Sequence, residues 1–116
     1  MIILDTIIKN GIIITALETY KADIGIKDGK IVTIASELND SSADIIDASG
    51  KYVLPGAIDG HTHLQMPFGG TVSSDSYEAG TRAAACGGTT TVFDFAIQQK
   101  GHGLIQTAKE RDALCA

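Results

Sequence analysis

The stretch YVLPGAIDGHTH, residues 52–63, says most about the fold of this chain. Its apolar part, residues 52–59, predicts a strand, and the pair His61 and His63 follows at the strand's end. Side chains two residues apart on a strand point the same way, so both imidazoles share one face. Imidazole is a good ligand for zinc and similar metals. The spacing predicts that the two histidines hold one metal ion, although a lone H-x-H also arises by chance.

The part of the chain after this strand has the pattern of a parallel α/β sheet. Asp75 and Glu78 fit a capping box at the start of a helix, and Gly87-Gly88 ends that helix. Residues 89–96 are strongly β-prone, and a second helix is predicted from about Leu104 to Leu114. Strand, helix, strand and helix at this spacing open a parallel sheet with helices packed on it.

The part before the strand predicts a small antiparallel β structure. Asn10-Gly11 and Asp28-Gly29 are hairpin signals between short runs of β-branched residues. Residues 1–54 are therefore expected to form part of a small β-sandwich. The strands predicted within it are residues 2–8, 12–15, 22–27, 30–34 and 45–48.

Composition excludes several classes of function. The chain has 116 residues, a net charge of −5 and only two arginines and seven lysines, which are scattered. That balance argues against a nucleic-acid surface or an anionic-membrane partner and indicates a solvated acidic surface. No signal peptide and no apolar run of about 18 residues is visible. We expect a cytoplasmic protein in which Cys86 and Cys115 are reduced thiols.

Several motifs together resemble the hydantoinase/dihydropyrimidinase branch of the amidohydrolase superfamily. The His-Thr-His-Leu-x-Met-Pro-Phe stretch is the most distinctive of them, and the resemblance covers essentially the whole chain. In order, the motifs are residues 8–11, 23–31, 46–56, 58–71 and 87–91.

The resemblance implies an α/β fold in two parts. Family members are a (β/α)₈ TIM barrel plus a β-sandwich. Residues 1–54 would be strands of the β-sandwich domain, and residues 55–116 would start the barrel domain. A barrel of this kind takes roughly 250 residues, so the chain is expected to contain only the first two β/α units.

The resemblance also implies a binuclear metal centre. Family members use two divalent metal ions, commonly zinc, which make a hydroxide available near neutral pH and polarise the scissile carbonyl. His61 and His63 match the pair that holds the more buried metal. The carbamylated lysine, two further histidines and the catalytic aspartate lie beyond Ala116 in the family's order. No catalytic residue is therefore assigned within the chain, and the 116 residues alone are expected to be inactive.

Five further residues are candidates for the site, each with an alternative. Asp59 shares the strand face of His61 and is expected to orient the ligating histidines or to cap a loop. Asp94 ends the second strand and would do the same, or cap the loop that follows. Leu64, Met66 and Phe68 match the family loop that contacts the substrate's ring substituent, or pack on the barrel rim. Gln65 replaces a carboxylate that many relatives carry.

The resemblance implies an enzyme that hydrolyses dihydropyrimidines or hydantoins to N-carbamoyl amino acids. The neutral surroundings of the histidines suit an uncharged cyclic amide or imide better than an acidic ring. A homo-oligomer, often a tetramer, is expected at full length. The alternatives are an allantoinase-like hydrolase, a non-catalytic dihydropyrimidinase-like scaffold protein and a free-standing small metal-binding domain. Retention of both histidines argues against the scaffold.

Overall fold

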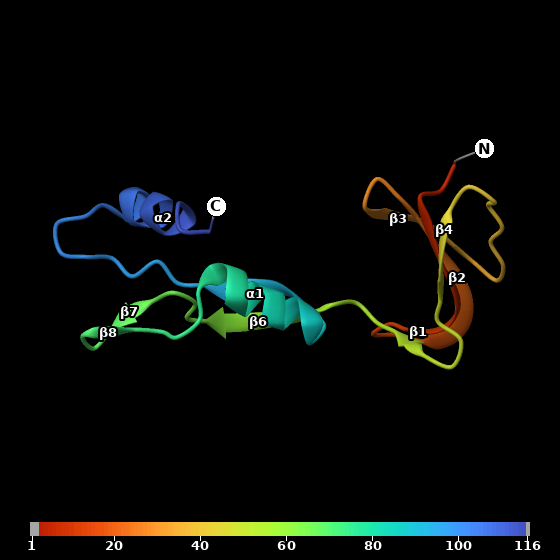
Figure 1. The fold of residues 1–116 in the computed structure, drawn as a ribbon, viewed down its shortest axis with the longest axis horizontal. Helices are drawn as coiled ribbons and strands as arrows, with labels where there is room; N and C mark the ends of the chain where they lie inside the picture. Colours follow the sequence, from red (N-terminus) through yellow and green to blue (C-terminus); the bar gives the residue numbers. More distant parts are fainter. Residues whose placement is uncertain (1–2, 116) are drawn as a thin grey trace. The chain divides into compact units, whose positions relative to one another are not determined.

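The computed structural model describes residues 3–115 of the chain. These residues form two compact units, Met1–Pro55 and Gly56–Ala116. Each unit has its own sheet, coloured from red to blue along the sequence in Figure 1. In the part of the chain that is described, neither helix has the length and apolarity needed to cross a bilayer.

The N-terminal unit is a five-stranded mixed sheet with the order β3-β2-β1-β4, in which β5 also pairs with β1. Strand β1 is antiparallel to β2, and β2 to β3, whereas β4 and β5 run parallel to β1. The expectation of a purely antiparallel first half was therefore wrong. The strands are β1 (Thr6–Ile14), β2 (Thr19–Lys27), β3 (Lys30–Ala35), β4 (Asp44–Asp47) and β5 (Tyr52–Val53).

Asp28-Gly29 forms the predicted hairpin turn, but Asn10-Gly11 does not. Asp28 and Gly29 have φ values of 49° and 70°, as a two-residue turn of this kind requires. Asn10 also has a positive φ, 63°, yet it lies inside the continuous strand β1 at a bulge in the pairing with β2. Its N–H donates to Asp23 Oδ1 (2.8 Å), and its side-chain amide donates to Asp47 Oδ1 (3.1 Å). Because these tertiary bonds hold Asn10, its left-handed conformation forms a bulge in β1 instead of a hairpin turn.

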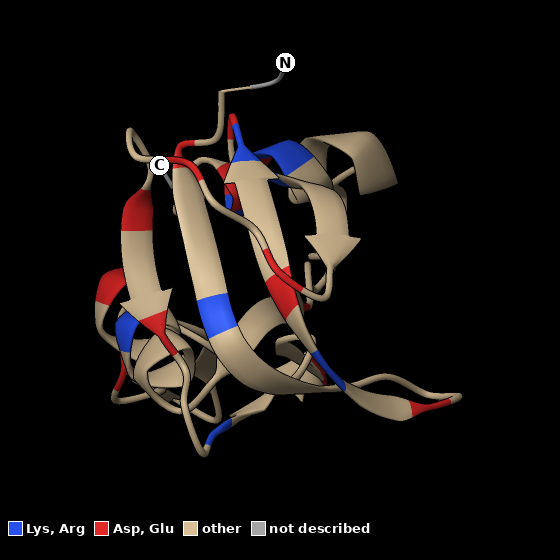
Figure 2. Cartoon of the chain, turned by 90° about the vertical axis from the view of Figure 1, so that its right-hand side faces the viewer, with Lys and Arg blue, Asp and Glu red and all other residues tan. Residues whose placement is uncertain are grey.

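A small apolar cluster holds the N-terminal unit together. Ile13, Ala22 and Ile24 are buried in it, and Ile8, Tyr20, Ile26 and Val53 pack against it. Much of the rest of the strand surface remains exposed, including Ile31, Ile34, Ile45 and Ile46. In the ribbon of Figure 2, the positions of Lys and Arg lie scattered among those of Asp and Glu.

The C-terminal unit contains two parallel strands, each followed by a helix. Strand β6 (Ala57–Thr62) pairs with β9 (Thr89–Asp94), and helix α1 (Tyr77–Cys86) connects them; α2 (Leu104–Asp112) follows β9. A short hairpin of β7 (Pro67–Phe68) and β8 (Thr71–Val72) lies between β6 and α1. The register places Thr62 beside Asp94, so the carboxyl ends of β6 and β9 are neighbours.

Two boundaries differ from those predicted. The single strand expected at residues 52–59 is two strands, because β5 pairs with β1 while β6 pairs with β9, and Pro55 between them has no N–H to donate. Helix α1 is capped by Ser76, whose Oγ accepts the N–H of Ala79 (3.2 Å), and not by Asp75. Gly87 ends α1 as predicted.

We predict that Asp23→Ala destabilises the N-terminal unit. Asp23 is 3% exposed, and its carboxylate accepts the N–H groups of Asn10 (2.8 Å) and Leu38 (3.0 Å). The alanine would leave both donors without partners, at a cost of about 3 kcal/mol in the free energy of unfolding. Urea denaturation followed by circular dichroism measures the change.

Asp44→Ala is the matched control, because Asp44 is an exposed strand carboxylate for which residues 3–115 provide no side-chain hydrogen bond. An equal loss in both variants would contradict the assigned role of Asp23.

Candidate metal centre

The two predicted histidines meet at the carboxyl end of β6. His61 lies in the strand, and His63 follows its last residue, Thr62. Both imidazoles are exposed, and their Nε2 atoms are 2.9 Å apart. The predicted convergence of the two rings is therefore seen in the structure.

The separation of the two Nε2 atoms fits a shared metal ion. Zinc–nitrogen bonds of about 2.0–2.1 Å at tetrahedral angles place two ligand nitrogens roughly 3.3 Å apart, and right-angled bonds place them about 2.9 Å apart. The same 2.9 Å also fits a hydrogen bond in which one neutral imidazole donates its Nε2–H to the other. A divalent cation would replace that shared proton.

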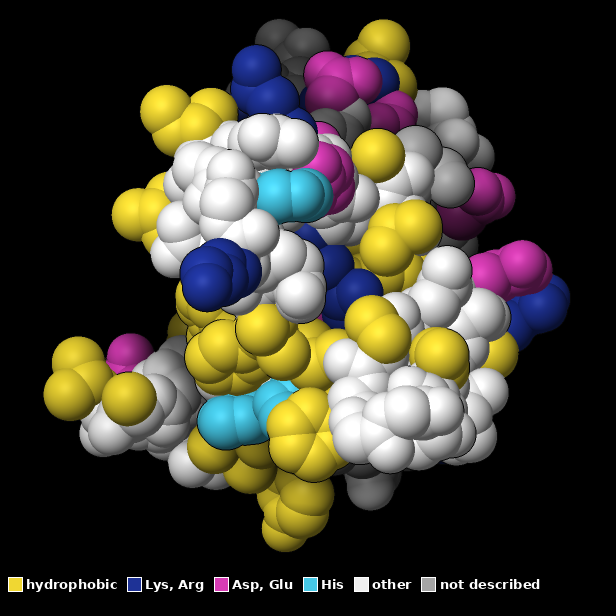
Figure 3. All heavy atoms as spheres, turned by 90° about the vertical axis from the view of Figure 1, so that its left-hand side faces the viewer, with side chains coloured by type: hydrophobic (Ala, Val, Ile, Leu, Met, Phe, Trp, Pro, Cys, Tyr) yellow, Lys and Arg dark blue, Asp and Glu magenta, His cyan; other side chains and the backbone are white. Residues whose placement is uncertain are grey.

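Phe95, the residue after β9, packs against both imidazoles. Its ring centroid lies 4.5 Å from that of His61 and 5.7 Å from that of His63, the latter in an edge-on arrangement. In the lower part of Figure 3, histidine side chains lie at the surface among hydrophobic side chains. An apolar ring beside the pair limits the orientations that the imidazoles can take.

Asp59 contacts the backbone of the pair. Its Oδ1 accepts the N–H of His61 at 3.1 Å, which stabilises the local conformation at the end of β6. That the carboxylate also orients an imidazole during metal binding stays a prediction.

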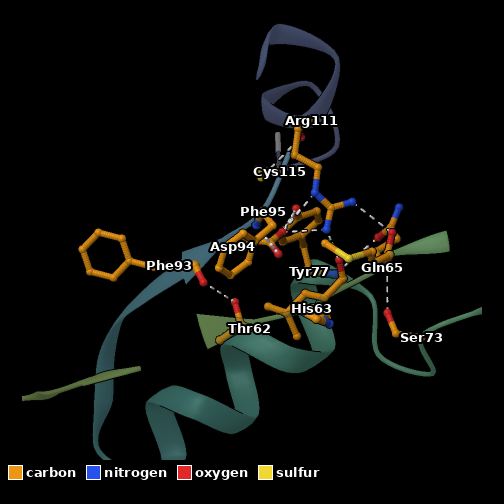
Figure 4. Close-up of polar contacts among 12 residues, drawn as sticks. Thr62, His63, Gln65, Ser73, Tyr77, Phe93, Asp94, Phe95, Arg111 and Cys115 are labelled. Atoms are coloured by element: carbon orange, nitrogen blue, oxygen red, sulfur yellow. Dashed lines mark hydrogen bonds and ion pairs between the residues drawn. The ribbon is translucent and has the colours of Figure 1, made fainter. Parts of the chain in front are cut away.

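Asp94 is the centre of a polar network instead of a direct partner of the imidazoles (Figure 4). Its Oδ2 accepts from the Tyr77 hydroxyl and from Arg111 Nη2 (2.6 Å) and Nε (3.0 Å), and its Oδ1 accepts the N–H of Phe95 (2.8 Å). The expected capping of the following loop is present. A bond to His61 or His63 is not among these contacts, so bracing of the histidines by Asp94 stays a prediction.

The network shifts the proton affinities of its members. Burial and the hydrogen bond to Asp94 raise the pKa of the Tyr77 hydroxyl far above its ordinary value. Burial alone would raise the pKa of Asp94, but the bonds from Tyr77, Phe95 and Arg111 outweigh it and hold that pKa below its usual range. Asp94 is therefore ionised and Tyr77 protonated at neutral pH.

Arg111 was not anticipated from the sequence. Its guanidinium is largely buried, lies 4.9 Å from the centroid of the Tyr77 ring, and donates to the carbonyl oxygens of Leu64 and Gln65 (3.1 Å for Gln65). Helical periodicity places it in α2 but does not reveal which carbonyls it reaches. The only available signal was that Arg111 is one of just two arginines in the chain.

The three predicted substrate contacts lie in different surroundings. Leu64 packs against α1, where a Cβ added to Gly80 would lie 2.3 Å from its Cδ2. Met66 is buried and lines a cavity of about 150 Å³ together with Phe95. Phe68, in the β7–β8 hairpin, is 78% exposed. Their role in substrate binding stays a prediction.

The candidate metal centre has two histidines in the part of the chain that is described. Within residues 3–115, no group of three or more histidine, cysteine or carboxylate side chains is arranged to hold a cation. The third histidine, His102, pairs with Glu110 (3.3 Å).

Comparison with known proteins places this chain in a family. The model of the amidohydrolase family matches residues 52–115, and that of the urease alpha-subunit N-terminal domain matches residues 1–54. The chain therefore belongs to the amidohydrolase family. A D-hydantoinase of Geobacillus stearothermophilus is 58% identical over 98 residues, covering 84% of this chain and 21% of that protein.

Solved structures agree with the sequence relatives. A D-hydantoinase crystal structure superposes with a TM-score of 0.90 at 52% identity, and dihydropyrimidinase from Brevibacillus agri with 0.90 at 49%. Each comparison covers 94% of this chain and 24% of the other. The predicted resemblance and fold class are confirmed. The chain spans about a quarter or less of the length of these relatives.

We predict that Asp94→Asn weakens the C-terminal unit in a pH-dependent way. Because the pKa of Asp94 is lowered in the folded state, its contribution is complete above the unfolded value of about 3.9 and is lost as pH falls through the lower folded value. The variant should be less stable by about 2 kcal/mol at pH 7, with the difference shrinking as pH falls below about 4. Denaturation curves at a series of pH values test this, and a constant difference would contradict it.

Proposed function

We propose that a polypeptide as long as these relatives and carrying these 116 residues is a metal-dependent cyclic amidohydrolase. It would open the ring of hydantoins or dihydropyrimidines by hydrolysing the cyclic amide to an N-carbamoyl amino acid. The observation that carries the proposal is the 2.9 Å approach of His61 Nε2 and His63 Nε2 at the end of β6, in a chain of the amidohydrolase family. The hydantoinase and dihydropyrimidinase names of its relatives support the ring class.

The proposed cofactor is a pair of divalent metal ions, with zinc as the favoured metal. His61 and His63 would hold one ion, and the remaining ligands, including a carbamylated lysine, would come from barrel segments outside residues 1–116. When bound, such ions lower the pKa of water and polarise the scissile carbonyl. Asp59 would keep the end of β6 in place through the His61 N–H, and Phe95 would restrict the imidazole rings.

The positions of the two arginines favour a substrate with a neutral ring. Arg111 is paired with Asp94 and with two backbone carbonyls, and Arg82 lies 3.8 Å from Glu78 on α1. Each guanidinium therefore has its partner within the chain instead of a substrate carboxylate beside the histidines. An uncharged hydantoin or dihydropyrimidine fits this better than an acidic ring. The allantoinase-like alternative also uses a neutral ring, so comparing allantoin with hydantoin as substrate separates the two.

The setting proposed for the enzyme is cytoplasmic, as a homotetramer that binds neither nucleic acid nor membranes. The scattered lysines and the net charge of −5 support the absence of an anionic partner. Light scattering of the longer polypeptide tests the tetramer.

We predict that the 116-residue chain binds one divalent ion per molecule through His61 and His63. Cu²⁺ is the most sensitive probe, because it binds nitrogen ligands more tightly than the other divalent first-row metals. Either His61→Ala or His63→Ala should weaken binding at least tenfold in calorimetric titration. His102→Ala is the matched control and should bind like the parent chain.

The activity is tested on the longer polypeptide with hydantoin and dihydrouracil. We expect ring opening, measured as loss of amide absorbance, that chelators abolish and zinc restores. Substitution of His61 or His63 by alanine should lower kcat/KM by at least a thousandfold, since it removes ligands of a metal that acts as Lewis acid. Ring opening that persists in both variants would contradict the proposal.

We predict that Phe68 contributes to the choice of ring substituent. Its exposed side chain, at the start of the hairpin turn, has apolar area to bury against a substituent. Phe68→Ala should raise KM for a phenyl-substituted hydantoin about tenfold and leave KM for unsubstituted hydantoin unchanged. Val72→Ala, an exposed apolar residue of the same hairpin, is the control. Equal effects on both substrates would contradict the assignment.

A further inference from the structure

Arg111 is a charged side chain whose position the proposed chemistry leaves unexplained. It lies in α2, far along the sequence from the histidines, yet its side chain is only 13% exposed. A guanidinium withdrawn from water is expensive unless its donors are satisfied. Arg111 meets that need with the carboxylate of Asp94 and the carbonyl oxygens of Leu64 and Gln65.

The two carbonyls belong to the residues that come directly after His63. Arg111 Nη2 donates to Leu64 O, and Nη1 donates to Gln65 O at 3.1 Å. Gln65 has a φ of 46°, in the left-handed region that non-glycine residues seldom adopt. Two donors of one rigid guanidinium therefore hold the backbone through an unfavourable turn, and this fixes the direction in which the chain leaves His63.

The guanidinium is itself held in place from two sides. Asp94 Oδ2 accepts from both Nε and Nη2, and the Tyr77 hydroxyl bonds the same oxygen while its ring lies 4.9 Å from the guanidinium carbon. Asp94 is the register partner of Thr62, the residue between the histidines. Figure 4 shows Arg111 reaching from its helix to Asp94 and toward the loop of Gln65. The network thus connects α2, the end of β9 and the backbone after His63.

We propose that Arg111 is a positioning residue for the metal-binding pair. It fixes the backbone after His63 so that the His63 imidazole stays within reach of the ion held by His61. This inference rests on the proposed metal-binding role of the two histidines. Lysine cannot replace Arg111 fully, because a single ammonium does not present the planar, divergent donors that reach two carbonyls and a carboxylate together.

The test is a metal titration of the 116-residue chain and its variants, with Cu²⁺ followed by its visible absorption and Zn²⁺ by calorimetry. Arg111→Lys and Tyr77→Phe are the informative variants, since each keeps most of the side-chain volume. We expect both to weaken metal binding, by about tenfold for Arg111→Lys, and to shift the Cu²⁺ band. Arg82→Lys, an exposed arginine on α1, is the matched control and should change neither quantity.

The outcomes distinguish failure of the proposed metal site from failure of the positioning role of Arg111. If His61→Ala binds metal as tightly as the parent chain, the proposed metal site itself is wrong. If His61→Ala loses binding while Arg111→Lys and Tyr77→Phe keep the parent's affinity and Cu²⁺ spectrum, the positioning role is overturned. A purely stabilising Arg111 would lower the melting temperature of the metal-free chain without moving the spectrum of the folded fraction. That result also counts against the proposal. It remains measurable even if Arg111→Ala fails to fold, because Arg111→Lys and Tyr77→Phe keep most of the side-chain volume.

Discussion

The parallel pairing of β6 with β9 is the constraint on which the candidate site depends. Its register sets Thr62 beside Asp94 and brings the residues that follow both strands to one edge. A hydrogen bond from the Thr62 hydroxyl to the Phe93 carbonyl (3.0 Å) reinforces this end of the pair. The two histidines and Phe95 meet because parallel strands deliver their carboxyl ends to the same place, which is also where barrel enzymes build their sites.

Polar contacts hold together much of the C-terminal unit. Large apolar side chains of its strands, among them Ile58 and Phe93, are more than half exposed, so apolar packing among the described residues is limited. The ion pair of Asp94 with Arg111 is instead mostly shielded from water, and it holds together α2, the end of β9 and the loop after His63. In such a pair the loss of one partner is costly, because the remaining charge stays buried and unpaired.

Sequence reasoning succeeded where a residue acts through local geometry. Alternate positions on a strand brought His61 and His63 together, Asp28-Gly29 turned the chain, and Gly87 ended a helix. It failed where residues far along the chain determine the local conformation or the position of a side chain. Asn10 became a bulge because Asp23 and Asp47 accept its N–H groups, and Arg111 acquired its place through carbonyls more than forty residues away. The same left-handed Asn-Gly signal suits a turn and a bulge alike, so only tertiary contacts choose between them.

The most direct test of the shared-ligand claim is nitrogen NMR of the imidazoles during addition of Zn²⁺ to the ¹⁵N-labelled chain at neutral pH. We predict that the Nε2 resonances of His61 and His63 shift together and saturate at one equivalent, while those of His102 stay in place. Movement of only one of the two resonances, or of all three histidines in parallel, would contradict a metal ion held jointly at the end of β6.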